Sequence, residues 1–290
     1  MNWIVASLLM LVFSNIYYLT MRVAQQRGID AKYYMVANFS IPAVLYFVLG
    51  RSAGYNFWLT PIQYAAIALN AIVFSYIGSV ISYHAMKKAP NAGYSVIIQK
   101  SYGIYTAILS VLFFGSALPA WKFGAILLVV VSTGIVMGLF EKKIPGSSKG
   151  NVWIWLSLIA FFCFGTLQFI AQWIARTWHI PTPVYLMWVM IIVDMFSIGE
   201  LVRTRHVRTL TWNMTNIALL AGIGVSVTGF YYFLQAGQLV APNIGYVGAI
   251  NTASNAVLTL LAAWLLKDKF SWKRFIGVVG VSIGVMLLVI

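Results

Sequence analysis

The sequence predicts an all-α integral membrane protein in which ten transmembrane helices form two inverted repeats of five helices each. Three observations predict this fold: the composition, a series of long apolar stretches, and a motif that occurs twice. Hydrophobic residues make up 61% of the 290 residues and charged residues only 8%, whereas soluble domains contain about 45–50% apolar and about 25% charged residues. So few charges could not cover the surface of a water-soluble protein of this size.

Ten apolar stretches are each long enough to cross a hydrocarbon core of about 30 Å as a helix. They are nearly continuous rather than alternating, which favours helices over the strands of a membrane barrel. Turn-forming sequences rich in glycine, proline and asparagine separate them. The stretches cover residues 2–21, 33–49, 61–86, 91–114, 121–140, 151–175, 183–201, 213–239, 242–266 and 273–290.

A six-residue motif stands at the start of the fourth and the ninth stretch. Residues 89–94 read Ala-Pro-Asn-Ala-Gly-Tyr, and residues 241–246 read Ala-Pro-Asn-Ile-Gly-Tyr. Other identical residues recur at a similar offset of roughly 150, which indicates an internal repeat of the kind found in transporters. These matches are Trp121-Lys122 with Trp272-Lys273, Ser132 and Gly134 with Ser282 and Gly284, Trp3 with Trp153, and Ser7 with Ser157.

This offset divides the chain into a first five-helix repeat over residues 1–140, a linker over 141–150 and a second five-helix repeat over 151–290. Because each repeat crosses the membrane an odd number of times, the two copies lie in opposite orientations. Inverted repeats are typical of secondary transporters, which bind their substrate near the midplane between the repeats and open alternately to the two sides.

Ten helices in two five-helix units, with Ala-Pro-Asn opening the fourth and ninth helices, resemble the drug/metabolite transporter superfamily, and its EamA-like permeases most of all. The resemblance extends over the whole chain. It implies a secondary transporter that exports a small polar metabolite, amino-acid-like or otherwise anionic. Other branches of the superfamily leave two alternatives open, an exchanger of organophosphates or nucleotide sugars and a flippase for lipid phosphates.

The net charge of +14 is distributed unevenly among the predicted loops. Fifteen cations fall in odd-numbered loops and three in even-numbered loops, so the charge reflects topology rather than nucleic-acid binding. We expect a multi-pass protein of the cell (inner) membrane. The positive-inside rule places its odd-numbered loops in the cytoplasm and both termini outside. The family resemblance implies the opposite orientation. The odd-numbered loops hold Arg22, Arg27, Lys32, Lys87, Lys88, Lys142, Lys143, Lys149, Arg203, Arg205, Arg208, Lys267, Lys269, Lys273 and Arg274, and the even-numbered loops hold Arg51, Lys122 and Arg176.

Lys100 is the remaining cation and lies about ten residues into the fourth stretch, roughly 15 Å along a helix. A cation at that depth is costly, so it must face a cavity or a partner. The functional interpretation is an electrostatic anchor for the carboxylate or phosphate of a substrate. The structural alternatives are an ion pair and a lysine that reaches out of a shifted helix.

The repeat suggests neighbours for Lys100. Alignment of the two motifs places Gln99-Lys100 opposite Asn251-Thr252, and Asn255 lies one turn beyond Asn251 on the same helical face. The same part of the chain resembles the nucleotide-sugar and sugar-phosphate branches, in which cationic residues of the fourth and ninth helices anchor the substrate. That resemblance implies that Gln99, Lys100, Asn251 and Asn255 bind the substrate.

Asp194 is the only acid deep inside a stretch, in the predicted seventh helix. Three interpretations remain open: a protonation site that couples transport to an ion gradient, a counter-ion for Lys100, and a static hydrogen-bonded contact between helices.

Polar and aromatic residues elsewhere in the stretches add further candidates. Gln168 and Gln172 are four residues apart and share one face of the sixth helix, where they either line the cavity or pack against another helix. Tyr102 belongs to a group of tyrosines in the third, fourth, eighth and ninth helices that could stack on a substrate or gate its path.

A membrane-embedded enzyme is the less favoured alternative. An intramembrane aspartyl protease needs two acids inside the stretches, and this chain has one. A serine–histidine hydrolase would need a histidine deep inside a stretch, whereas His84, His179 and His206 all lie at the ends of stretches. The single cysteine, Cys163, excludes an intrachain disulfide and a cysteine-based metal cluster, and no nucleotide-hydrolysis motif occurs. We therefore expect no catalytic residue, no metal and no cofactor.

The expected partners are a small-molecule substrate and the lipid bilayer. Two small-residue motifs, Gly134-x-x-x-Gly138 and Gly280-x-x-x-Gly284, allow helices to approach closely within one chain or between chains. The chain is thus expected to be a monomer or a homodimer.

Overall fold

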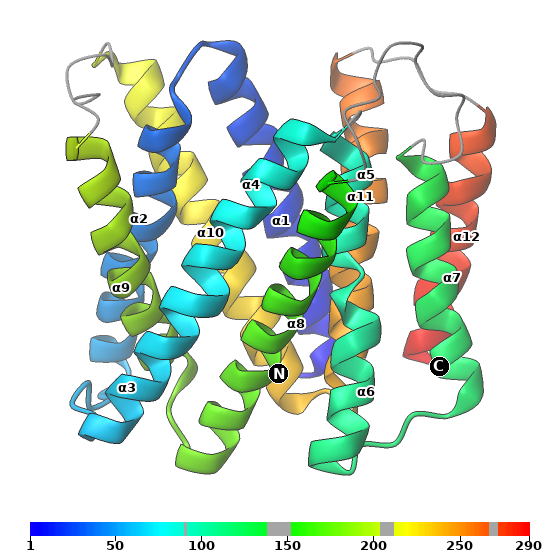
Figure 1. The fold of residues 1–290 in the computed structure, drawn as a ribbon, viewed down its shortest axis with the longest axis horizontal. Coiled ribbons are helices and arrows are strands. Elements are labelled where there is room, and N and C mark those ends of the chain that lie inside the picture. The colour runs from blue at the N-terminus through cyan, green and yellow to red at the C-terminus, as the bar shows by residue number, and fades with distance from the viewer. Residues whose placement is uncertain (90–91, 138–151, 204–211, 267–271) are drawn as a thin grey trace.

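The structure, a computed structural model, describes residues 1–89, 92–137, 152–203, 212–266 and 272–290. Within these ranges every regular element is helical and no strand is present (Figure 1), which confirms the all-α prediction. Nine helical segments of the described chain have the length and composition needed to cross a membrane. A further apolar helix, Ala120–Val136, has 17 residues.

Each predicted stretch coincides with one helix or with consecutive helical segments. In chain order the elements are α1 (Trp3–Gln26), α2 (Ala31–Ser52), α3 (Pro61–Leu69), η1 (Asn70–Ile77), α4 (Gly78–Lys88), α5 (Ala92–Lys100), α6 (Tyr102–Phe114), α7 (Ala120–Val136), α8 (Val152–Trp178), α9 (Thr182–Arg203), α10 (Met214–Val240), α11 (Ile244–Leu266) and α12 (Trp272–Val289). The predicted linker 141–150, and Gly138 of the first small-residue motif, lie outside the described residues.

Two of the predicted stretches are interrupted, which the apolar pattern does not anticipate. The third stretch consists of α3, η1 and α4, where η1 is a π-helical segment in the middle of an otherwise α-helical rod. The fourth consists of α5 and α6, separated at Ser101. Such departures from regular α-helix are frequent at functional sites.

Local sequence explains where several helices begin and end. The backbone N–H of Thr60 donates to Gln63 Oε1 at 2.8 Å, and Pro61 occupies the first position of α3, a typical helix start. Asn213 caps α10 by accepting from the backbone N–H of Asn216 at 2.8 Å. At the C-terminal end of a helix, Gly115 ends α6 with a φ of +63°, a left-handed conformation that glycine adopts without strain.

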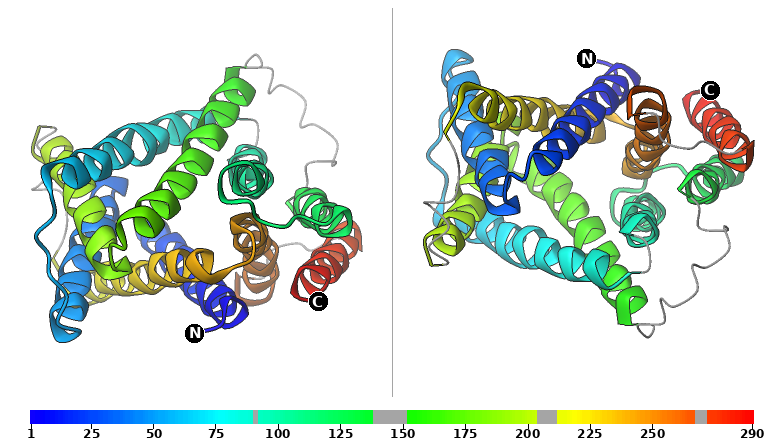
Figure 2. Two further views of the ribbon diagram at one scale, coloured as in Figure 1. Left: turned by 90° about the horizontal axis from the view of Figure 1, so that it is seen from below. Right: turned by 90° about the horizontal axis from the view of Figure 1, so that it is seen from above.

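The helices pack as neighbours that are far apart in sequence. Extensive contacts join α1 to α10, α2 to α9, α4 to α8, α6 to α11, and α7 to α12. Seen along the bundle, α7 and α12 form a pair at one side (Figure 2). The connections 53–60, 115–119, 179–181 and 241–243 lie at the end of the bundle where both termini are found, and the connection 27–30 lies at the opposite end (Figure 1).

We call these the even-loop end and the odd-loop end. The described cations gather as the loop pattern predicts. Those at helix ends on the odd-loop end are Arg22, Arg27, Lys32, Lys87, Lys88, Arg203, Lys273 and Arg274, and those on the even-loop end are Arg51, Lys122 and Arg176.

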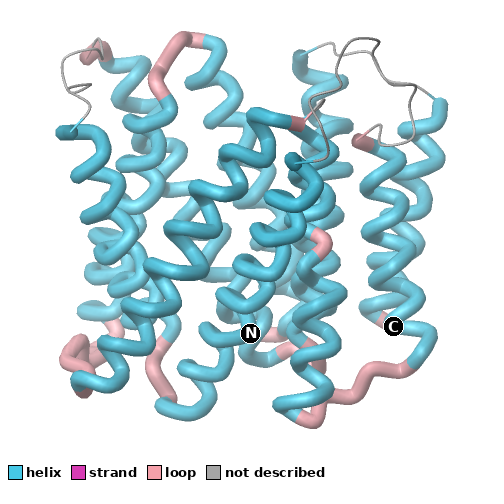
Figure 3. The backbone as a smooth tube through the Cα atoms, in the orientation of Figure 1, coloured by secondary structure: helices cyan, strands magenta, loops and turns pink. Residues whose placement is uncertain are grey.

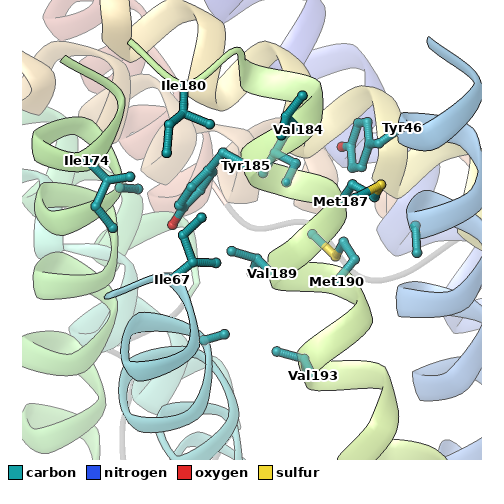
Figure 4. Packing of buried hydrophobic residues seen from close by; sticks show 14 of the residues in the cluster. Tyr46, Ile67, Ile174, Ile180, Val184, Tyr185, Met187, Val189, Met190 and Val193 are labelled. Atoms are coloured by element: carbon teal, nitrogen blue, oxygen red, sulfur yellow. The ribbon is translucent and has the colours of Figure 1, made fainter. Parts of the chain in front are cut away.

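The largest buried apolar cluster packs α9 against its neighbours (Figure 4). Tyr185, Met190 and Val193 of α9 meet Tyr46 of α2 and Ile67 of α3. On the outside of the bundle, in contrast, large apolar side chains are exposed, which fits a multi-pass membrane protein whose outer surface contacts lipid. They include Leu8, Leu112, Trp155, Phe162 and Met286.

Glycines allow two pairs of helices to approach closely. A Cβ atom on Gly103 of α6 would stand 2.9 Å from the backbone of Gly248 and Ala249 in α11. Gly277 and Gly284 of α12 press on the backbone of α7 in the same way, near Ser132 and Ala125. The second predicted small-residue motif, Gly280-x-x-x-Gly284, therefore serves packing within the chain.

Candidate functional site

The break between α5 and α6 creates the environment of Lys100. In a continuous α-helix the N–H of Ile104 would bind the carbonyl of Lys100, but here it donates to the carbonyl of Ser101 at 2.9 Å. The freed carbonyl of Lys100 accepts instead from Thr252 Oγ1 of α11 at 2.6 Å. The break lies near the middle of the bundle's height (Figure 3), so an exposed backbone acceptor there needs this partner.

The side chain of Lys100 is held by neutral groups alone. Its Nζ donates to Asn255 Oδ1 at 3.0 Å and lies 4.3 Å from the centroid of the Tyr18 ring. Among the described residues it forms no ion pair. An ammonium has three N–H donors, of which Asn255 accepts one. The cation–π contact with Tyr18 is a weaker interaction than an ion pair with a carboxylate would be. The side chain is also partly exposed, so the cation remains able to bind an anion.

Asn255 supplies a second unsatisfied donor at the same place. Its Oδ1 accepts from Lys100, while its Nδ2 is buried without a hydrogen-bond partner. The two atoms belong to one amide, so this free N–H group lies next to the ammonium. Buried polar groups are normally paired, and an unpaired amide donor beside a cation is suited to one more oxygen acceptor.

One turn earlier on α11, Asn251 donates from Nδ2 to the hydroxyl of Tyr102 at 2.8 Å, and its Oδ1 is buried without a partner. Tyr102 itself is only 4% exposed. The structure thus brings Lys100 and Asn255 together directly, and it joins Asn251 to Tyr102 on the adjoining turns of α11 and α6.

Aromatic rings border this site on the side of α1 and α10. The rings of Tyr17 and Tyr18 are 4.7 Å apart, Tyr17 stacks on Phe230, and Phe230 contacts Tyr231. Tyr17, Tyr18 and Tyr231 are each partly exposed. We call Lys100, Asn255 and these tyrosines the central cluster.

Gln99, predicted as a substrate ligand, makes a different set of contacts. Its Oε1 accepts from Ser82 Oγ at 2.6 Å, and its Nε2 donates to Ser95 Oγ at 2.7 Å. Ser95 in turn contacts Ser157 Oγ at 2.7 Å. Gln99 is 3% exposed, so the structure places it in a hydrogen-bond network that joins α4, α5 and α8 rather than beside the ammonium of Lys100. The physical reason is helical geometry, since consecutive residues point about 100° apart.

The predicted pair Gln168 and Gln172 divides between two environments. Gln168 is partly exposed, whereas Gln172 is fully buried against α10. Gln172 Nε2 donates at 3.4 Å to the carbonyl of Gln235 and to Gln238 Oε1. Gln172 therefore meets α10 near its C-terminus and is not joined to Lys100.

Asp194 lies between α9 and α2, where Ser40 Oγ donates to its Oδ2 at 2.5 Å. Its Oδ1 is buried without a hydrogen-bond partner. In the described part of the chain no ion pair connects Asp194 with Lys100. The structure thus assigns each of the two residues its own neighbours, and a role of Asp194 in coupling stays a prediction.

Three contributors to these environments escaped the sequence analysis. By the repeat offset of 150 Tyr18 corresponds to Gln168, which does not indicate its contact with Lys100, and Ser40 carries no distinguishing signal. Arg176 was counted only as a loop cation, although it follows Gln172 by four residues and so shares its helical face. Among the described residues no group of three histidines, cysteines or acids could hold a metal ion.

Comparison with known proteins shows the fold and no more. No protein-family model and no curated protein matches this chain. Among solved structures, 28 chains match. One of them, a protein of known crystal structure, superposes with a TM-score of 0.80 over 98% of this chain and 94% of its own length, at 12% sequence identity.

Proposed function

We propose that the chain is a secondary transporter that moves a small anionic metabolite across the membrane by alternating access between two inverted five-helix repeats. The observation that carries this proposal is Lys100, a cation beside the break between α5 and α6 whose hydrogen-bond and cation–π partners, Asn255 and Tyr18, are both neutral. Intramembrane cations of this kind mark substrate and ion pathways. The proposal includes no chemical step, cofactor or metal.

The reciprocal packing of the helices supports two inverted repeats. With the repeat offset, α1 corresponds to α8 and α10 to the segment α3–η1–α4; α1 packs on α10, and α8 packs on α4. Likewise α1 packs on α11, while α8 packs on α5 and α6. The matched serines behave alike too, since Ser7 donates to the carbonyl of Trp3 at 2.8 Å and Ser157 to that of Trp153 at 2.7 Å.

In this proposal the ammonium of Lys100 and the free N–H of Asn255 bind the anionic end of the substrate together. Tyr17, Tyr18 and Tyr231 contact its remaining part. The resemblance to EamA-like permeases favours export of an amino-acid-like metabolite. A phosphate would fit the same two donors, so an organophosphate, a nucleotide sugar or a lipid phosphate is the second candidate.

The direct test is transport by purified protein in proteoliposomes. Uptake and efflux would be measured for a panel of amino acids, other carboxylates, sugar phosphates and nucleotide sugars, with a lipid-scrambling assay for lipid phosphates. Transport of a carboxylate is the expected result. Transport of phosphorylated solutes alone favours the second candidate, and no transport of any anion contradicts the proposal.

Asp194 gives a separate prediction about coupling. In Asp194→Asn the amide oxygen can still accept from Ser40, so the contact between α9 and α2 is retained while the ionisable group is lost. If Asp194 carries the coupling proton, we expect gradient-driven transport to be lost, because an amide cannot take up and release that proton, while exchange of substrate without a gradient persists. Equal loss of both activities would indicate a structural contact instead, and gradient-driven transport at the original rate would remove the coupling role.

The orientation of the chain is predicted by its loop charges. Reporter fusions at residues 1 and 290 should both report an extracytoplasmic position, because the odd-loop end carries most of the cations. A cytoplasmic signal from both fusions would support the orientation that the family resemblance implies. Replacement of Lys87 and Lys88 by glutamine, compared with the same replacement of Lys122, would show whether the charges decide the orientation.

A further inference from the structure

A polar seam closes α8 against α10 at the even-loop end. Gln172 reaches the carbonyl of Gln235 and the side chain of Gln238. One turn further along α8, the guanidinium of Arg176 donates to the carbonyls of Gln238 and Leu239 at 3.3 and 3.5 Å. These carbonyls belong to the last turn of α10, where backbone acceptors lack partners within the helix and favour a positive charge.

Arg176 also binds a third helix. Its guanidinium carbon lies 4.6 Å from the centroid of the Phe114 ring, in the last turn of α6. One side chain thus connects the ends of α6, α8 and α10. No acid pairs with Arg176 among the described residues, so these three contacts are what hold it.

The seam is incompletely satisfied. Gln172 Oε1, Gln235 Nε2 and Gln238 Nε2 are all buried without hydrogen-bond partners, although the three side chains are at most 3% exposed. In the interior of a membrane protein each such group carries a desolvation cost. A flip of the Gln172 side-chain amide, which exchanges Oε1 and Nε2, would not remove the cost, because Oε1 would then face the carbonyl oxygen of Gln235.

In the described part of the chain, the packing of α8 on α10 has no equally extensive counterpart at the opposite end of the bundle. The offset of 150 that relates Trp3 to Trp153 makes Gln172 correspond to Arg22 of α1. The offset of 152 that relates the two Ala-Pro-Asn motifs makes Gln238 correspond to Met86 of α4. In a symmetric bundle α1 would close on α4 as α8 closes on α10. Yet within the described ranges α1 packs mainly on α10 and α11, with no comparable packing on η1 or α4. Among the described residues, α8 therefore meets α10 at the even-loop end without an equally extensive contact between α1 and α4 at the odd-loop end.

We infer that the α8–α10 seam is the gate on the even-loop side and that Arg176 is its latch, closed in this structure while the corresponding seam at the odd-loop end is open. This inference rests on the proposed function and adds a named gate to it. When the seam parts, its three unpaired amide atoms gain water or polar groups of the passing substrate. That gain opposes the loss of the Arg176 contacts.

Thiol cross-linking tests the asymmetry of the two ends. In a background with Cys163→Ala, the pair Gln172→Cys and Gln238→Cys should be joined by a short bis-methanethiosulfonate. The pair Arg22→Cys and Met86→Cys, at the corresponding positions of the other repeat, should not. Loss of thiols available to a maleimide-polyethylene glycol gives the readout as a gel shift. Equal cross-linking of the two pairs, or cross-linking of the second pair alone, would overturn the inference.

The latch is tested by the reactivity of Gln172→Cys in the same background toward a charged methanethiosulfonate added from the even-loop side. Arg176→Ala should raise the rate by about tenfold or more, because it removes two charge-assisted hydrogen bonds. Arg51→Ala removes an exposed cation at the same end and should leave the rate unchanged. An unchanged rate in Arg176→Ala overturns the latch.

Neither measurement needs a substrate, so both separate the gate from the proposed transport. If Arg176→Ala fails to fold, the cross-linking comparison still decides, because Arg176 is intact in it. A chain that transports nothing but shows the asymmetric seam would contradict the proposed function without contradicting the seam. Normal transport together with symmetric cross-linking would contradict the gate alone.

Discussion

Lys100→Ala is expected to weaken binding of the anionic substrate by about 10- to 100-fold and to reduce its transport correspondingly. The reason is the loss of a charged donor inside the bundle, where hydrogen bonds to ions contribute about 1.5–3 kcal/mol and 1.4 kcal/mol corresponds to a tenfold change in affinity. The measurement is concentration-dependent uptake into proteoliposomes. Asn255→Leu, which removes the neighbouring amide donor, should show a smaller effect in the same direction.

Lys122 offers a matched control for this experiment. Its Nζ also donates to a neutral oxygen, the carbonyl of Leu288 at 3.2 Å, and also lies over aromatic rings, those of Trp121 and Tyr246. It lies at the even-loop end of α7 rather than in the central cluster. Lys122→Ala should therefore leave substrate affinity unchanged. Equal effects of the two substitutions, or full transport by Lys100→Ala, would refute the substrate anchor.

Gly245→Ala is expected to cause the largest loss of stability among single-methyl additions. The new Cβ would overlap Ala107 of α6 and stand 2.6 Å from the carbonyl oxygen of Gly103. Because backbone atoms cannot move aside like the end of a flexible side chain, α6 and α11 must separate. Overpacking of this kind costs about 1–3 kcal/mol and sometimes more. A fall in the midpoint of thermal unfolding in detergent is the measurement.

Gly124→Ala provides the control, since a Cβ on Gly124 of α7 meets no atom within 4 Å. Alanine is favoured over glycine in helices by about 1 kcal/mol, so this variant should be as stable as the natural chain or slightly more stable. If Gly245→Ala were equally stable, the close approach of α6 and α11 would not exist. The same approach places Thr252 against the freed carbonyl of Lys100, so Gly245→Ala should also impair transport.

Features of this fold that depend on local sequence can be predicted, and features that depend on contacts between helices cannot. Apolar stretches of sufficient length predicted where the helices lie, because in a bilayer each segment must satisfy its own backbone hydrogen bonds. The apolar pattern does not predict the π-helical segment η1 or the break at Ser101. These interruptions depend on partners from other helices, such as Thr252 for the carbonyl of Lys100, and no local pattern announces them.

The candidate site was predicted in its key residue and only partly in its neighbours. Lys100 stood out by itself, since a lone cation in an apolar stretch is costly wherever the helix lies. Asn255 was reached through the repeat, and the structure places it on the ammonium at 3.0 Å. Gln99, adjacent in sequence, points to Ser82 and Ser95 instead, and Tyr18 came from a helix that no alignment with Lys100 could indicate.

By itself the sequence determined that this chain is helical and apolar, that its cations collect at one end, and that one lysine lies deep among apolar residues. Composition and local periodicity decide these properties. Only the tertiary structure decided which groups surround that lysine, that Asp194 faces Ser40, and that Arg176 contacts the ends of α6 and α10. These contacts join residues from 62 to 155 positions apart, and their geometry depends on how whole helices cross, which no local pattern specifies.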